Sequence, residues 1–288
     1  MAVHPDTLAL VARTDAHEGP VYAAGEDALY FTSVPAGGRS SIRRLDLATG
    51  EIATVVEDAN GANGMTMDRD GRLVVCEQGS LGTPARITRR DPGTGAGEAL
   101  VEHWEGRRLN SPNDVVVAAD GAIWFTDPSY GHLQGFRPEP EVGDFVYRHD
   151  PATGDLDVVA DGFDKPNGLA FSPAGDVLYV TDSGANQAPG SFHPGRPHHV
   201  KAFDVVGGRR LAGERLFAVT APGFPDGIKV DAAGRVYVSA ANGVLVYSAD
   251  GDRLGEIPVP AAVNFAWGPP GLLYITTDTA VWSAELGA

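Results

Sequence analysis

A spacing that recurs along the chain constrains its fold more than any other feature of the sequence. In four places an asparagine or aspartate is followed eight residues later by a glycine, and a short apolar run comes after the glycine. These pairs are Asn63 with Gly71, Asn113 with Gly121, Asn167 with Gly175, and Asp226 with Gly234. Looser copies with a gap of seven residues begin at Glu18 and Asn264. Six copies that start 38 to 59 residues apart are typical of a protein built from structural repeats.

Each repeat contains the sequence signals of four short strands. An apolar segment lies on either side of the glycine, which marks the turn between them, as at Gly121 before the strand predicted over Ala122–Thr126. A second turn signature then separates two further β-rich segments, at Asp46 to Gly50, Asp91 to Gly95, Asp150 to Gly154, and Asp204 to Gly208. Six repeats of four antiparallel strands predict an all-β, six-bladed β-propeller that occupies residues 1–288 as a single domain.

The two ends of the chain are expected to close the ring together. The last repeat runs out of chain after Val281 and Trp282, before a fourth strand can form. The apolar N-terminal run Leu8 to Ala12 can supply that strand and leave no open sheet edge between the first and last blades. Helical periodicity is essentially absent, and Pro and Gly are too frequent for long helices.

Composition excludes several classes of partner. The formal net charge of −16 opposes binding to nucleic acid or to an anionic membrane surface. The single cysteine, Cys76, excludes an internal disulfide and follows Val74 and Val75, as expected for a buried strand position. No apolar run approaches the ~20 residues needed to span a membrane, so a soluble, cytoplasmic protein that acts on a small molecule is expected. The sequence does not predict an oligomeric state.

The first residues of the six repeats all carry a side-chain oxygen. The innermost strand of each propeller blade lines the central channel, so these residues are expected to form a ring near the axis. The ring residues are Glu18, Asn63, Asn113, Asn167, Asp226 and Asn264. Carboxylate and amide oxygens without sulfur or imidazole favour a hard cation, calcium before zinc, with magnesium and manganese also possible. The alternative is that each residue only makes a turn at the start of a strand, although turn chemistry does not favour Glu18.

Four segments of the chain resemble a known family. They are EGPVY from Glu18, RLNSPNDVVVAADGAIWFTDPSYG around Asn113, KPNGLAFSPAGDVLYVTDSG around Asn167, and FPDGIKVDAAGRVYVSAANG around Asp226. Together they resemble the senescence marker protein, gluconolactonase and luciferin-regenerating enzyme family, whose members are six-bladed propellers. The second segment is similar to the bacterial gluconolactonase version.

The resemblance implies a catalytic metal site. The metal ligands that it implies are Glu18, Asn113, Asn167 and Asp226. It also implies that Asp226 is the general base or the nucleophile, and related diisopropyl fluorophosphatases hold calcium with a similar ligand set. Animal members of the family carry a substrate-binding arginine two residues before the asparagine that is paired with an aspartate, and Ser111 stands at that position here. The resemblance therefore gives a more specific expectation for the metal ligands than for the substrate.

Two long segments are expected to form irregular loops above the ring. They span residues 128–144 and 183–199 and join the second strand of a blade to the third. Asp127 and Asp182, which directly precede them, can cap a turn or orient a neighbouring asparagine. The residues proposed to contact substrate, for which the alternative is an ordinary exposed position, are Asn63, Asn264, Tyr130, Phe136, Arg137 and His193.

These expectations combine into a metal-dependent hydrolase that opens a lactone or a similar cyclic ester. Calcium would act as a Lewis acid on the carbonyl group, and Asp226 would take a proton from the attacking water. An organophosphate or aryl-ester hydrolase at the same site is an alternative. A propeller that binds a ligand without chemistry is another, because this fold alone does not determine function.

Overall fold

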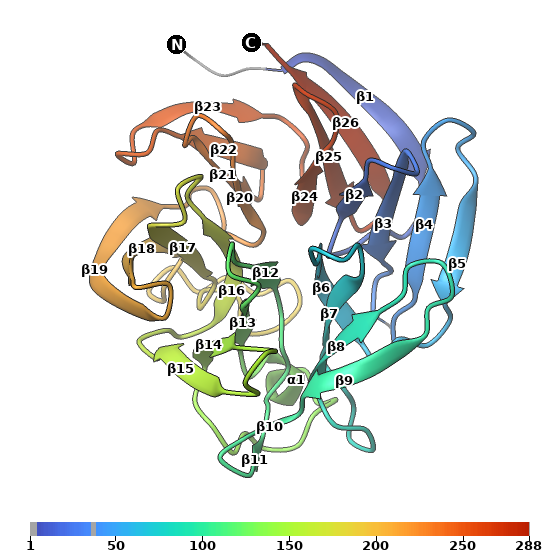
Figure 1. The fold of residues 1–288 in the computed structure, drawn as a ribbon. Helices are drawn as coiled ribbons and strands as arrows, with labels where there is room; N and C mark the ends of the chain where they lie inside the picture. Colours follow the sequence, from blue (N-terminus) through green and yellow to red (C-terminus); the bar gives the residue numbers. More distant parts are fainter. Residues whose placement is uncertain (1–4, 36–38, 288) are drawn as a thin grey trace.

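The computed structural model describes residues 5–35 and 39–287. Six four-stranded antiparallel sheets stand in a ring around a central axis, and the strand that begins each sequence repeat is the innermost strand of its sheet (Figure 1). The all-β, six-bladed propeller predicted from the repeats is confirmed.

The strands of the six blades follow one another along the chain. Blade 1 consists of β2 (Val21–Ala23), β3 (Ala28–Thr32), β4 (Ile42–Asp46) and β5 (Ile52–Val56). Blade 2 consists of β6 (Ala62–Met67), β7 (Leu73–Glu77), β8 (Arg86–Arg90) and β9 (Gly97–Val101). Blade 3 consists of β12 (Val115–Val117), β13 (Ile123–Asp127), β14 (Phe145–His149) and β15 (Leu156–Ala160). Blade 4 consists of β16 (Pro166–Phe171), β17 (Val177–Asp182), β18 (His199–Val206) and β19 (Arg210–Val219). Blade 5 consists of β20 (Ile228–Val230), β21 (Val236–Ala240), β22 (Gly243–Tyr247) and β23 (Arg253–Ile257).

Blade 6 contains both ends of the chain. It consists of β24 (Asn264–Trp267), β25 (Leu272–Thr277) and β26 (Ala280–Leu286), with β1 (Pro5–Arg13) as the outermost strand. β1 pairs antiparallel with β26, which places Leu8 opposite Ala284 and Leu10 opposite Trp282. The predicted closure of the ring by an N-terminal strand is therefore confirmed, and the strand extends beyond the expected Leu8–Ala12.

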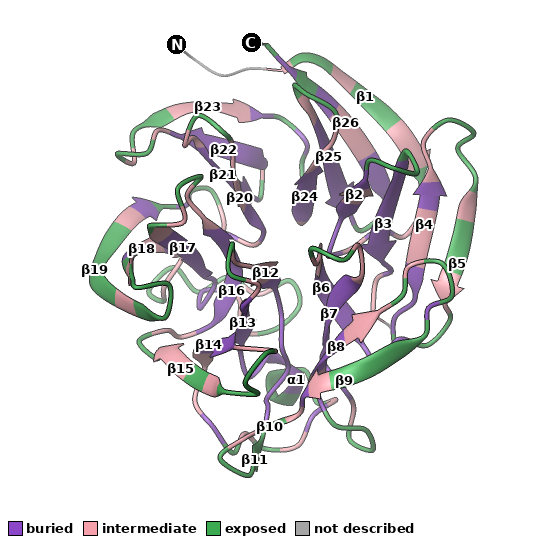
Figure 2. Cartoon of the chain, viewed as in Figure 1, coloured by how far each residue is buried: buried purple, intermediate pink, exposed green. Residues whose placement is uncertain are grey.

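Apolar side chains pack between neighbouring blades. The second strands β3, β7, β13 and β21 are buried over their whole length, because each blade lies against another on both faces. Tyr237 of blade 5, for example, packs with Phe265 and Ile275 of blade 6. Within the strands, most of the exposed positions lie on the outermost strand of a blade (Figure 2). Cys76 is fully buried in β7, as predicted.

Two small elements lie outside the repeat pattern. The one-turn helix α1 (Tyr130–Leu133) lies within the first long loop, and β10 (His103–Trp104) pairs with β11 (Arg107–Arg108) between blades 2 and 3. Neither was predicted, because segments this short have no periodicity to detect. The described residues include no helix that is long and apolar enough to cross a membrane.

The first strands approach one another so closely at the axis that glycine is required beside the ring residues. A Cβ atom added to Gly64 would lie 2.4 Å from the carbonyl oxygen of Asn113, and one added to Gly168 would lie 2.5 Å from that of Asp226. Gly64 also donates its N–H to the carbonyl oxygen of Asn113 at 2.7 Å. Gly64 and Gly168 do not have positive φ, so close packing rather than turn geometry accounts for them.

We expect Gly64→Ala to lower the free energy of unfolding by about 2 kcal/mol, because the new methyl group would meet backbone atoms of blade 3 that no side-chain rotation can move. Gly25→Ala is the matched control, since a Cβ added there has no heavy atom within 4 Å and its φ is not positive. Chemical denaturation followed by tryptophan fluorescence measures both variants. Wild-type stability of Gly64→Ala would contradict the close approach.

Candidate functional site

A pocket of about 410 Å³ lies where the innermost strands begin. Five of the six ring residues line it: Glu18, Asn63, Asn113, Asn167 and Asp226. They come from five different blades, and each stands at or just before the start of its innermost strand. The repeat therefore brings together residues that lie more than 200 positions apart in the sequence.

Three amide oxygens of the ring have no hydrogen-bond partner within the described residues. They are the buried Oδ1 atoms of Asn63, Asn113 and Asn167. An unpaired buried polar atom lowers the stability of the folded state by about 1–3 kcal/mol. Three such oxygens in one pocket therefore indicate a bound group that contacts them. In the described part of the chain no three His, Cys, Asp or Glu side chains gather closely enough to hold a metal by themselves. Amide oxygens beside two carboxylates do fit a hard divalent cation such as calcium.

The two carboxylates of the ring have different surroundings. Glu18 is 2% exposed, and its Oε2 accepts hydrogen bonds from the N–H of Gly19 at 3.0 Å and from Nδ2 of Asn264 at 2.7 Å. Asp226 is only partly buried and lines the pocket. Burial raises the pKa of both carboxyls, assisted by the charge of Asp114 for Glu18 and by the charge of Glu18 for Asp226. A divalent cation between them would favour both ionised forms.

A buried aspartate holds the segment that carries Asn113. Asp127, at the end of β13, accepts hydrogen bonds from the N–H groups of Asn110 and Ser111 at 2.9 and 2.8 Å. Burial raises the pKa of Asp127 to about 8, and these two N–H donors oppose the shift. The contacts agree with the orienting role suggested for Asp127, because they anchor the chain two and three residues before the ring asparagine.

The same arrangement recurs in blade 4. Asp182, at the end of β17, accepts hydrogen bonds from the N–H groups of Asp164 and Lys165 at 3.0 and 2.9 Å. These donors again lie three and two residues before a ring asparagine, Asn167. The equivalent contacts of Asp127 and Asp182 indicate that the second strand of a blade fixes where its own ring residue stands.

Buried threonines connect blades 1, 3 and 4 to the ring residue of the next blade. Thr126 donates its hydroxyl to the carbonyl oxygen of Asn167 at 2.7 Å, and Thr181 donates to that of Asp226 at 2.9 Å. Sequence reasoning missed these residues. Their signal is a threonine that recurs at one position of the second strand, at Thr32, Thr126, Thr181 and Thr276.

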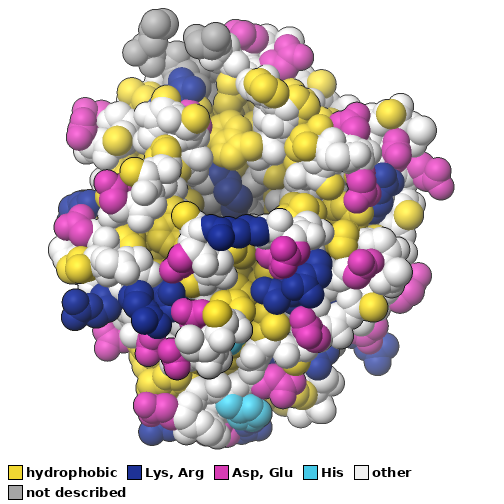
Figure 3. All heavy atoms as spheres, viewed as in Figure 1, with side chains coloured by type: hydrophobic (Ala, Val, Ile, Leu, Met, Phe, Trp, Pro, Cys, Tyr) yellow, Lys and Arg dark blue, Asp and Glu magenta, His cyan; other side chains and the backbone are white. Residues whose placement is uncertain are grey.

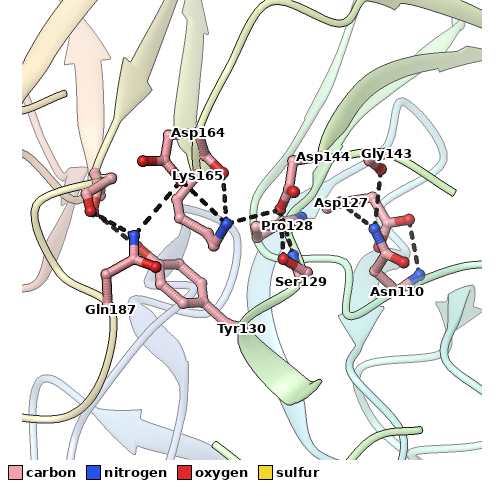
Figure 4. Close-up of polar contacts among 12 residues, drawn as sticks. Asn110, Asp127, Pro128, Ser129, Tyr130, Gly143, Asp144, Asp164, Lys165 and Gln187 are labelled. Carbon is pink, nitrogen blue, oxygen red and sulfur yellow. Dashed lines mark hydrogen bonds and ion pairs between the residues drawn. The ribbon is translucent and has the colours of Figure 1, made fainter. Parts of the chain in front are cut away.

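The two long loops are both attached to the segment that leads into β16 (Figure 4). In the first loop, Asp144 accepts a hydrogen bond from the N–H of Ser129 at 2.6 Å and lies 3.4 Å from Nζ of Lys165. Lys165 also donates to the carbonyl oxygen of Asp164 at 2.6 Å. In the second loop, Nε2 of Gln187 donates to Oδ1 of Asp164 at 3.5 Å. These contacts hold both loops beside the pocket.

Among the residues proposed from the sequence to contact substrate, Asn63 and Tyr130 line the pocket. Tyr130 lies in α1, and its hydroxyl donates to the carbonyl oxygen of Ser183 at 3.2 Å. Asn264 is 1% exposed, and both ends of its amide bind within the protein. It therefore lies behind Glu18 rather than on the pocket wall.

Phe136, Arg137 and His193 do not line this pocket. Arg137 is buried, and its guanidinium donates to four backbone carbonyl groups, among them those of Asn110 at 2.9 Å and Ser80 at 2.7 Å. It fixes the first loop to its surroundings. The sequence locates these loops, but it does not predict which of their side chains turn inward.

Ser111, which stands where animal relatives have an arginine, is fully buried. Its hydroxyl donates to the carbonyl oxygen of Pro128 at 2.6 Å and accepts a hydrogen bond from the N–H of Gly131 at 2.9 Å. This position therefore supports the start of the first loop and does not face the pocket.

Sequence reasoning missed a histidine–aspartate pair in the pocket. His17 directly precedes Glu18, and its Nδ1 lies 2.7 Å from Oδ1 of Asp278. Burial lowers the pKa of His17, but the hydrogen bond to Asp278 and the charge of Glu18 shift it upward overall. In the sequence, only the position of His17 beside a ring residue could have indicated that it lines the pocket. Other lining residues that were missed are Gln78, Gln134 and Asn186.

Fold and pocket together define a six-bladed β-propeller with a polar pocket where its innermost strands begin. The chain belongs to the SMP-30/Gluconolactonase/LRE-like family, whose model matches residues 16–279, so the resemblance is confirmed. It is 30% identical over 278 residues to a gluconolactonase from Zymomonas mobilis, in a match that covers 88% of this chain and 73% of the relative.

Solved structures agree with this assignment. A gluconolactonase from Xanthomonas campestris matches with a TM-score of 0.84 and 34% identity, over 97% of this chain and 89% of that chain. The calcium-binding protein regucalcin from Agrobacterium tumefaciens shares the fold, with a TM-score of 0.75 and 16% identity over 98% of this chain and 94% of that chain.

Proposed function

We propose that this protein is a hydrolase that opens a lactone with the help of a divalent cation, calcium first, held at the ring. The observation that carries the proposal is the meeting of three unpaired amide oxygens with two carboxylates in one pocket. Membership of a family that includes gluconolactonases supports a lactone as the substrate. The fold shared with a calcium-binding protein is consistent with calcium as the cation.

The residues proposed to hold the cation are Glu18, Asn113, Asn167 and Asp226. When bound there, calcium supplies Lewis-acid polarisation of the lactone carbonyl. Glu18 offers Oε1 to it, because Oε2 is occupied by the hydrogen bonds from Gly19 and Asn264. The two asparagines contribute neutral oxygens, so the two negative charges of the ligand set match the charge of the ion.

Asp226 is the residue proposed to accept a proton from the attacking water. It is the less buried of the two ring carboxylates, so it can reach a water molecule in the pocket. Without a cation, burial and the charge of Glu18 raise the pKa of Asp226, and a cation at the ring would favour its ionised form, which is the form that accepts a proton. Water adds to the carbonyl carbon, the ring C–O bond breaks, and Asp226 can return its proton to the leaving oxygen. The product is a hydroxy acid.

The pocket wall favours a lactone that carries hydroxyl groups. The polar lining residues outside the ring are His17, Gln78, Tyr130, Gln134, Asn186 and Asp278. Their amide, phenol, imidazole and carboxylate groups can donate to and accept from substrate hydroxyls. Among the described residues, the apolar side chains of the wall are Val34, Pro35 and Pro189. An aryl ester or a phosphotriester would find little apolar surface here, so those substrates are the weaker alternative.

We expect the calcium-loaded protein to hydrolyse aldonolactones with kcat/KM about 100-fold above that for aryl esters or phosphotriesters of similar size, because only the hydroxylated substrates satisfy the polar wall. Acid release at constant pH measures all three on one scale. Faster turnover of a phosphotriester would support the alternative hydrolase. No turnover of any substrate would favour a propeller that binds without chemistry.

A further inference from the structure

One lysine stands in the channel at a position where three other blades have no charge. Lys229 lies in β20, three residues after the ring residue Asp226. The residues at the same distance from the ring in blades 2, 3 and 4 are Thr66, Val116 and Ala170. The face drawn in Figure 3 is hollowed at its centre, and Lys or Arg side chains lie in and around the hollow. The proposed hydrolysis assigns no role to Lys229.

Lys229 contacts two polar side chains from other blades. Its Nζ donates to Oδ1 of Asn264 at 3.2 Å and lies 3.9 Å from Oδ2 of Asp114. The side chain of Lys229 is 22% exposed, whereas that of Asp114 is 2% exposed. A lysine that is largely removed from water and held by two partners has a defined position, which a surface lysine does not.

These contacts determine which way the amide of Asn264 points. Its Oδ1 accepts hydrogen bonds from Nζ of Lys229 and from the N–H of Phe265, the second at 2.8 Å. Its Nδ2 donates to Oε2 of Glu18 at 2.7 Å. Rotating the amide by half a turn would place its oxygen against the carboxylate of Glu18 and its NH₂ group against the ammonium group. Both contacts would then be repulsive.

Close packing also restricts Asn264. A Cβ atom added to Gly227 would lie only 2.4 Å from Oδ1 of Asn264 and 2.8 Å from its Cα atom. Gly227 directly follows Asp226, so the backbone of one ring residue presses against the side chain of another. Asn264 has little room to adopt a second rotamer that would still reach Glu18.

We propose that Lys229 is a positioning residue for the metal site, which acts on Glu18 through Asn264. Lys229 keeps the amide of Asn264 turned so that its NH₂ group binds Oε2 of Glu18, and Oε1 is thereby directed to the cation. This inference rests on the proposed function, because it assumes that Glu18 is a metal ligand. The charge of Lys229 is not the means, because a positive charge near the site by itself opposes cation binding.

Direct measurement of calcium binding tests the inference. We expect Lys229→Met, which keeps the length of the side chain, to weaken calcium binding about 10-fold in calorimetric titration of the decalcified full chain. Asn264→Leu is expected to weaken it to a similar extent. Because both act on Glu18 by one route, the double variant should bind no more weakly than the weaker of the two single variants.

The control is Lys201→Met, which removes a lysine that pairs with Glu214 on the outer strands of blade 4. It is expected to leave calcium affinity unchanged. If Lys229 acted through its charge, Lys229→Met would bind calcium more tightly than the wild type, and tighter or unchanged binding overturns the inference. Additive losses in the double variant overturn it as well. If Lys229→Met does not fold, wild-type calcium affinity of Asn264→Leu overturns the inference.

Failure of the inference and failure of the proposed function give different results. A wild-type chain that binds no divalent cation overturns the metal site itself and this inference with it. A wild-type chain that binds calcium and opens lactones, while Lys229→Met binds calcium equally well, overturns only the role of Lys229.

Discussion

Asp226→Asn is expected to lower kcat about 1000-fold at saturating calcium, because the amide keeps the shape and one ligand oxygen of the carboxylate but cannot accept a proton from water. The substitution also removes one of the two negative charges of the ligand set, so calcium affinity should fall as well. Steady-state kinetics over a calcium titration separates the two effects. The loss that persists at saturating calcium measures the role of Asp226 in proton transfer.

The matched control for this variant is Asp157→Asn. Asp157 is exposed on β15, the outer strand of blade 3, so its substitution removes one carboxylate without touching the pocket. We expect it to retain wild-type kcat. If Asp226→Asn reaches wild-type kcat once calcium is saturating, Asp226 is a ligand only, and another group takes the proton.

Removal of calcium is expected to abolish lactone hydrolysis and to lower the melting temperature. Without the ion, the buried Glu18 and the partly buried Asp226 line one pocket as two carboxylates, with three amide oxygens unpaired. Calcium at 1000 times its Kd would stabilise the folded state by about 4 kcal/mol through binding alone. Chelation followed by gel filtration, with activity and thermal melting measured before and after calcium is added back, tests this. Full activity after complete removal would contradict the metal-dependent mechanism.

The stabilisation by calcium should depend on pH in a defined direction. Burial raises the folded-state pKa of Glu18 and of Asp226 above the unfolded values. Without calcium, the folded chain keeps protons that the unfolded chain has already released. Its stability therefore falls as pH rises from about 4, the unfolded pKa, toward the raised folded values. Calcium binds the ionised forms, so the gap between melting temperatures with and without calcium should widen over the same interval. A gap that is independent of pH would contradict this assignment.

The fold was predictable because its signal is redundant. Four copies of one spacing and two looser copies specify the same four-stranded unit, so the gap of seven at Glu18 and Asn264 does not change the architecture. The position of Asn113 could be predicted for the same reason. Once the repeat sets where the innermost strands begin, propeller geometry brings their first residues to the axis.

The side chains outside the repeat were not predictable to the same extent. Arg137 and His193 lie in the long loops, where the sequence has no period that indicates which side faces inward. One is buried among backbone carbonyl groups and the other is exposed, and neither lines the pocket. His17 does line it, although its only signal was its position beside Glu18.

The sequence by itself determined the number of blades, the strand that closes the ring and the set of oxygens gathered at its axis, because these follow from local patterns repeated at regular intervals. Only the tertiary structure decided how those oxygens are used. It turned Asn264 away from the pocket and toward Glu18, 246 positions away, and left the amide oxygens of Asn113 and Asn167 unpaired. Such contacts join distant segments through the packing of neighbouring blades, and no local pattern encodes the direction in which a single amide points.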